Sequence, residues 1–391
     1  MYVVHILGSN RKPWLILVRS IGLAAPSTTS TPPLLPEIWQ DIFDCQVFTC
    51  DSVSNIRLTC KSFAVLTKPL AFRQFLFYPF VNGMRDSQRF QPTKDVVDRS
   101  IARLKFWASD NIAHHVHDLF IYPLRRNQPH DIEGDSDRLL VSLFQVLHHF
   151  LNLQSLSCQG FPFNDFALRQ LCRLENLRTL SLNRSSITAA TSFPASLRLD
   201  SLMYTTGSSD DTDKEQDRTN INWLSVAHPR RIQYVSLEIW YPCVAEHFLH
   251  FFASTDGTQY VTDLHMLYSD TLIQLLVSAL SRIQSYPLKK LVFARNLEMH
   301  SEPLPNFGSV EVPSLQTYSG PHQLLRSVVP GCAIRHAYLC GLGMSEYSDP
   351  STLLRTLRHL PDSIGNLQVL SLHVTYVTVE ILEIVFSRCI S

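Results

Sequence analysis

The chain has 391 residues, of which 45% are hydrophobic and only 17% are charged. This composition can bury a large core, and the length exceeds one average domain, so order is expected over most of the chain. The 34 basic and 34 acidic residues cancel to a formal net charge of zero, which leaves no electrostatic footprint for nucleic acid or for an anionic membrane surface.

The nine cysteines are odd in number, widely spread and never arranged as Cys-x-x-Cys. This argues against a disulfide framework and against a zinc site. We expect mostly buried thiols in a reducing compartment, which means the cytoplasm, the nucleus or both.

The N-terminal segment, residues 1–33, is expected to be a disordered leader and linker. Its apolar run Trp14–Val18 is interrupted by Arg19, so it is too short for a secretory core or a membrane span. Residues 26–33 are polar and bounded by prolines, with nothing to bury.

Residues 34–80 predict a small helical module. Pro36 followed by Glu37 is a helix start, and a second helical run extends from Ser52 to Leu66, ending before Pro69. Residues 70–80 then alternate as in a strand. So small a unit buries too little apolar surface to be secure alone, and it should need a partner or the following domain.

Three pieces of this module, residues 35–43, 56–63 and 69–73, resemble an F-box of the fungal type, in the right order. In that family the Leu-Pro pair and the apolar helix faces dock on a small Skp-type adaptor, which bridges to a cullin and a RING subunit of a ubiquitin ligase. An alternative is a helical subdomain that merely packs on the rest of the chain. The resemblance implies the following adaptor-binding residues: Leu35, Pro36, Ile38, Trp39, Ile42, Phe43, Ile56, Leu58, Cys60 and Phe63.

A connecting helical segment, residues 81–115, with a charged helix from Thr93 to Trp107, precedes a repeat region that spans residues 116–391. The region shows the pattern apolar-x-x-apolar-x-apolar at spacings of 19 to 37 residues, against roughly 20–29 for regular leucine-rich repeats. Helical spacing in 163–174 and in 271–283 returns the chain between strands. The expected fold is α/β: a small helical F-box followed by an irregular leucine-rich-repeat solenoid of parallel strands and helices. The central residues of the repeats are Leu119, Leu156, Leu180, Leu202, Val235, Leu264, Leu291, Tyr318, Ala337 and Leu370.

Each central residue is followed by one that points to the opposite, concave face of such an arc. Five of the ten residues in this row are serines, which either relieve crowding or line a groove for an extended peptide, with Phe120 and Tyr338 as anchors. Met203, Val292 and Ser319 complete the row. The candidate target-binding residues are Phe120, Ser157, Ser181, Ser236, His265, Tyr338 and Ser371.

No convergent catalytic set is found. The run His114–His117 lacks acidic or cysteine partners at ligand spacing, and Glu246–His250 lacks the arrangement of a metalloprotease helix. We therefore expect no enzyme activity, no cofactor and no metal. The acidic run 208–217 is either a solvated loop or a phosphorylatable switch.

The sequence thus predicts a substrate-recognition adaptor of a Skp-cullin-F-box ubiquitin ligase. Its partners would be the Skp-type adaptor with its cullin complex and an unidentified protein target, with no nucleic acid and no membrane. The alternative is a repeat-based protein-interaction scaffold without ligase association.

Overall fold

A computed structural model of the chain provides the fold. It describes residues 3–7, 50–58, 60–79, 81–82, 89–90, 94–122, 124–125, 136–187, 197–205, 223, 231–238, 260–267, 287–294, 312–325, 332, 334–340, 350–358, 367–373 and 377–389.

Twelve strands form one open sheet in which every neighbouring pair is parallel. Except for β1, the strands follow one another in space as they do in the sequence. The expected α/β class with parallel strands is therefore confirmed. From one end of the sheet to the other the strands are β2 (Gln74–Phe77), β5 (Asp118–Ile121), β7 (Ser155–Gln159), β9 (Thr179–Asn183), β11 (Ser201–Thr205), β12 (Tyr234–Glu238), β13 (Asp263–Leu267), β14 (Lys290–Ala294), β15 (Thr317–Pro321), β16 (His336–Cys340), β17 (Val369–His373) and β1 (Val3–Leu7).

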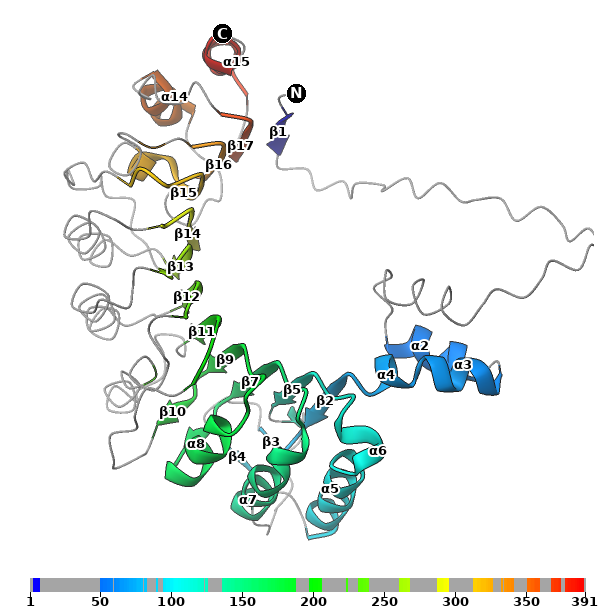
Figure 1. The fold of residues 1–391 in the computed structure, drawn as a ribbon. Helices are drawn as coiled ribbons and strands as arrows, with labels where there is room; N and C mark the ends of the chain where they lie inside the picture. The colour runs from blue at the N-terminus through cyan, green and yellow to red at the C-terminus, as the bar shows by residue number, and fades with distance from the viewer. Residues whose placement is uncertain are drawn as a thin grey trace, which may run out of the picture.

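The described helices of the arc cover one face of this sheet. Figure 1 shows the strands along the inner side of a curved arc and the labelled helices α5, α7, α8, α14 and α15 along its outer side, an arrangement compatible with a solenoid. We call the inner side, opposite these helices, the concave face. The helices are α2 (Cys50–Arg57), α3 (Lys61–Leu66), α4 (Lys68–Ala71), α5 (Lys94–Trp107), α6 (Asp110–Ala113), α7 (Ser136–Val146), α8 (Asp165–Cys172), α14 (Pro350–Arg358) and α15 (Val379–Cys389), with 3-10 turns η1 (Leu147–His149) and η4 (His322–Leu324).

Two small sheets lie beside the large one. One is three-stranded and the other is a parallel pair. Their strands are β3 (Val81–Asn82), β4 (Arg89–Phe90), β6 (Leu124–Arg125), β8 (Pro162–Phe163) and β10 (Ser186–Ile187).

Neighbouring strands of the large sheet begin with the same pattern of backbone hydrogen bonds. Two consecutive amides, one just before each strand and one at its first residue, donate to a single carbonyl of the preceding repeat, with N···O distances of 2.7 to 3.0 Å. We call this series the shared-carbonyl ladder. It aligns the strands although the repeats differ in length. Its ten acceptors are the carbonyls of Arg73, His117, Gln154, Arg178, Asp200, Gln233, Thr262, Lys289, Gln316 and Arg335.

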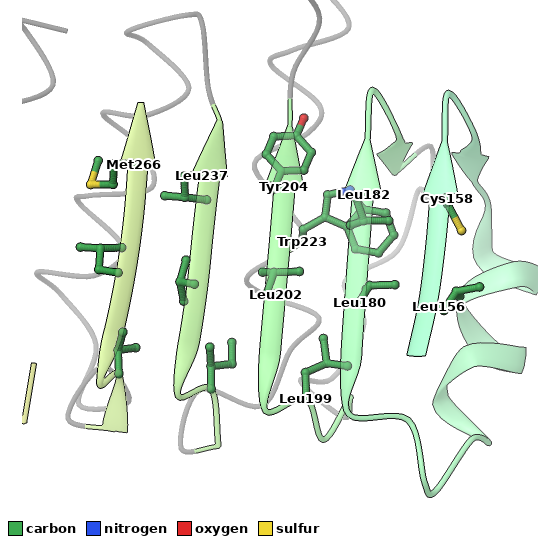
Figure 2. Close-up of a cluster of buried hydrophobic side chains, with 14 of the residues drawn as sticks. Leu156, Cys158, Leu180, Leu182, Leu199, Leu202, Tyr204, Trp223, Leu237 and Met266 are labelled. Carbon is green, nitrogen blue, oxygen red and sulfur yellow. The ribbon is translucent and has the colours of Figure 1, made fainter. Parts of the chain in front are cut away.

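The core lies between the sheet and the helices. The ten central residues predicted from the sequence, together with Phe75, stand in one register row, and none is more than 5% exposed. Figure 2 shows part of this row, Leu156, Leu180 and Leu202, with Trp223 packed beside Leu182. Full burial of one such leucine contributes about 1.5–3 kcal/mol, so this row is a main source of the stability of the arc.

Two expected helices are confirmed. The charged helix expected between Thr93 and Trp107 is α5, and the helical spacing in 163–174 becomes α8. The side chain of Asn164 caps α8 by accepting from the Ala167 amide at 2.9 Å. The remaining stretch with helical spacing, 271–283, lies outside the described residues.

The N-terminal third differs from expectation in three places. The helical run expected from Ser52 to Leu66 ends at Leu66 as predicted but is split into α2 and α3, and Pro69 lies in the first turn of a further short helix, α4, where an amide would have no partner in any case. The sheet begins at β2, inside the segment assigned to the first module, because Phe75 and Phe77 belong to the same core as the repeats. Val3–Leu7, expected as part of a disordered leader, forms strand β1 beside β17.

Candidate functional site

The first candidate surface is on helices α2 and α3. Leu58 is 85% exposed and Val65 is 71% exposed, which is unusual for side chains of this size, and Cys60 between them is exposed as well. Ile56 and Phe63 are half-buried. Exposed apolar side chains gathered on so small a module are typical of a partner-binding surface.

Local hydrogen bonds set the ends of α3. The Cys60 sulfur accepts from the Phe63 amide at 3.4 Å, and the hydroxyl of buried Thr67 donates to the Phe63 carbonyl at 2.6 Å. These bonds hold Val65 on a defined turn. Six of the predicted adaptor-binding residues, Leu35, Pro36, Ile38, Trp39, Ile42 and Phe43, lie outside the described residues.

The helical module is attached to the arc through aromatic contacts. The Phe72 ring lies edge-on to Trp107, with centroids 5.4 Å apart, and Phe75 stacks on the same indole at 4.5 Å. The Arg57 guanidinium lies 5.3 Å from the Phe72 ring centroid. The module is therefore anchored on α5, while Leu58 and Val65 stay exposed.

The second candidate surface is the concave face. The structure places the ten residues predicted for this face in a single register row, from Phe120 on β5 to Ser371 on β17. Ser157, Ser181, Ser236 and His265 are half-buried, and Tyr338 is 42% exposed. Candidate residues widely separated in the sequence thus share one surface.

Ser371 does not suit the role proposed for it. It stands in the expected row, but only 4% of it is exposed. A side chain so covered has almost no surface to offer a target, so the accessible row ends at Tyr338.

Two tyrosines of the concave face were missed by the sequence analysis. The Tyr122 hydroxyl is 2.9 Å from the Ser157 hydroxyl, and the Tyr234 hydroxyl is 3.3 Å from Nδ1 of His265. Tyr122 lies two residues after Phe120, and Tyr234 lies two residues before Ser236, so both tyrosines share the face of the predicted row. The strand alternation that predicted the row would also have predicted these neighbours.

The pKa of His265 on the concave face is shifted from its usual value. Burial lowers the pKa of its imidazole, nearby Lys290 lowers it further, and Asp263 opposes the shift. Its Nε2 atom is buried and has no hydrogen-bond partner. The neutral ring is therefore favoured, as expected for an aromatic surface rather than a cationic one.

Neither the histidines nor the cysteines form a reactive centre in the described part of the chain. The rings of His114 and His115 are 3.8 Å apart, but no group of three metal-ligating side chains occurs among the described residues. The Cys158 thiol is buried, which raises its pKa, and Cys332 is buried too. Cys60 is exposed, and Cys172 and Cys340 are half-buried, so the expectation of mostly buried thiols does not hold at these three positions.

The comparisons with known proteins add no family. A scan against models of protein families and a search among curated proteins both find no match for this chain. Among the helices that the structure describes, none is long and apolar enough to cross a membrane.

Proposed function

We propose that the chain is a non-catalytic adaptor that joins a ubiquitin ligase to a protein target. The α2–α3 surface docks on a Skp-type adaptor, as the F-box resemblance implies, and the concave face of the leucine-rich-repeat-like arc binds the target. The protein then acts by bringing two partners together.

One observation carries this proposal: Leu58 and Val65 are exposed on a module whose other end is anchored. Leaving one such side chain in water forgoes about 1.5–3 kcal/mol of burial energy. An apolar groove on a partner would recover that energy, and docking of amphipathic helices in such grooves is a recurrent mode of recognition.

The concave face suits the binding of a protein target. The concave face is extended, its outward positions alternate with buried ones, and Phe120, Tyr122 and Tyr338 supply aromatic area. Such positions can vary without disturbing the core, which suits recognition of a particular protein.

A second candidate function is a protein-interaction scaffold without a ligase. The contact of Phe72 with Trp107 favours it, because it packs the end of the helical module on α5 of the arc. In that case α2 and α3 would protect the core rather than bind an adaptor.

Co-purification with a Skp-type adaptor distinguishes the two. The double variant Leu58→Asp and Val65→Asp of the full chain should lose the adaptor, because two carboxylates would enter an apolar groove. Its melting temperature should stay unchanged, since both side chains are exposed in the free protein. Leu151→Asp is the matched control, because Leu151 is 70% exposed but lies in the arc.

Thiol labelling tests the contact between the α2–α3 surface and the Skp-type adaptor independently. Cys60 should react with iodoacetamide in the free chain and be protected in the adaptor complex, as followed by peptide mass spectrometry. If the double variant still binds the adaptor and Cys60 stays reactive in the mixture, the chain is a scaffold and the ligase proposal is wrong.

A further inference from the structure

The charged residues at the strand starts differ between the two halves of the sheet. In the first half, Arg73 lies 3.7 Å from Asp118, and Arg178 lies 3.8 Å from Asp200. Each of these ion pairs joins an arginine to an aspartate of the next repeat.

In the second half, the described strand starts carry cations that form no such ion pair. The described residues of β14, β15 and β16 and of the junctions before them include Lys289, Lys290 and Arg335 but no aspartate or glutamate. Lys289 and Arg335 are exposed, and Lys290 is half-buried. We call these three residues the cationic section.

One carboxylate borders the cationic section on one side. Asp263 on β13 is the register partner of Lys290, and its carboxylate accepts from the Thr262 hydroxyl at 2.7 Å. The positive surface therefore begins at β14 and is limited to the last part of the arc.

Polar and aromatic groups continue the cationic section across the concave face. Lys290, Thr317 and His336 stand in one register row on adjacent strands, so the first and the last are separated by two strand spacings, about 10 Å. Thr317 Oγ1 is 3.4 Å from Nδ1 of His336. Tyr338, one row further along β16, is 42% exposed.

We infer that the cationic section binds an extended acidic segment of a protein, with an apolar side chain of that segment packed on Tyr338. Side chains on one face of an extended chain are separated by about 7 Å at two residues and by about 13 Å at four, so carboxylates at such spacings can reach the long cationic side chains of β14 and β16 together. This inference rests on the proposed function only in placing the target on the concave face. What the inference adds is that the bound segment of the target is acidic and carries an apolar side chain.

Charge complementarity favours a short acidic segment over nucleic acid. Three cations neutralise too few phosphates to hold a polyanion, and the neighbouring Asp263 would repel one that ran further along the face. A peptide with a few carboxylates at one end meets the cations and avoids Asp263.

The test measures peptide binding to the full chain by fluorescence anisotropy. The probe is a labelled peptide in which glutamates flank a central leucine, and three further probes are the same peptide with lysines, the same peptide with phosphoserines, and a single-stranded RNA. The double variant Lys289→Glu and Arg335→Glu should weaken binding of the glutamate peptide about tenfold, and added salt should weaken binding to the wild type.

The matched control is Arg198→Glu with Arg231→Glu, which changes two exposed arginines before β11 and β12 by the same charge. This variant should bind the glutamate peptide as the wild type does. Tyr338→Ala should weaken binding while leaving its salt dependence unchanged, because it removes apolar contact and no charge.

Failure of the glutamate peptide to bind, or equal losses in the two double variants, would overturn the inference. Binding of only the phosphoserine peptide or only the RNA would overturn it as well, because either result assigns the cations to phosphate. Co-purification of the Skp-type adaptor depends on α2 and α3, so it should be the same for all these variants. The ligase proposal is therefore tested separately, by whether the adaptor co-purifies at all.

Discussion

Replacing Leu180 by aspartate tests the orientation of the sheet more sharply than any other single change. The Leu180 side chain has 0% exposure and lies between Leu156 and Leu202 in the row of central residues (Figure 2). The next residue, Ser181, points to the concave face and is half-buried. Two adjacent positions therefore provide a test of the core and its control.

The expected loss at Leu180 is large. Truncation of a buried leucine to alanine costs about 2–5 kcal/mol, and a buried carboxylate without a partner adds several more. Since a typical domain is stable by only about 5–15 kcal/mol, Leu180→Asp should unfold at least the repeats around β9. Ser181→Asp should change the free energy of unfolding by about 0.5 kcal/mol or less.

Urea denaturation followed by circular dichroism provides the measurement, with Leu180→Ala as an intermediate reference. The transition midpoint should fall in the order Ser181→Asp, Leu180→Ala, Leu180→Asp. If Ser181→Asp proved as damaging as Leu180→Asp, the strand register would be shifted by one residue and the proposed concave face would be the buried one.

Three further predictions concern single sites. Gly320→Ala should lower the free energy of unfolding by about 1–3 kcal/mol in the same urea assay, because the added Cβ would lie 2.9 Å from Cδ2 of Phe293; an unchanged midpoint would contradict the packing of β14 on β15. Because burial lowers the pKa of His265, the unfolded chain binds the proton more readily, so stability should fall as the pH drops below about 6.5. His265→Gln should remove part of that pH dependence, and identical slopes for the two proteins would refute the shift. Under native conditions iodoacetamide should modify Cys60 and spare Cys158, as judged by peptide mass spectrometry, and modification of Cys158 first would show that this part of the core opens readily.

The alternation of apolar and polar residues in the sequence predicts most of the fold, because it locates the strands of the large sheet. Even the weak repeats centred on Tyr318 and Ala337 were found, because an apolar residue, Leu315 or Ile334, stands three positions before each of them, and all four side chains are buried. The concave row followed from the same alternation.

What the sequence did not reveal depends on contacts between distant segments. β2 follows α4 directly and was grouped with it, whereas its partner β5 lies 44 residues further on when Phe75 is compared with Leu119. Burial of Ser371 and the ion pair of Arg178 with Asp200 likewise arise only when neighbouring repeats stack. Local pattern predicts the orientation of a side chain but not what covers it.

Because of the shared-carbonyl ladder, the alignment of a strand does not depend on the length of its repeat. Only 19 residues lead from Tyr318 to Ala337, against 44 from Phe75 to Leu119, yet both connections end at the same pair of backbone hydrogen bonds. Because these bonds use main-chain groups alone, any residue except proline can occupy the ladder positions. The arc is therefore suited to retargeting by protein engineering: loops can be lengthened and concave residues exchanged while the strands keep their register.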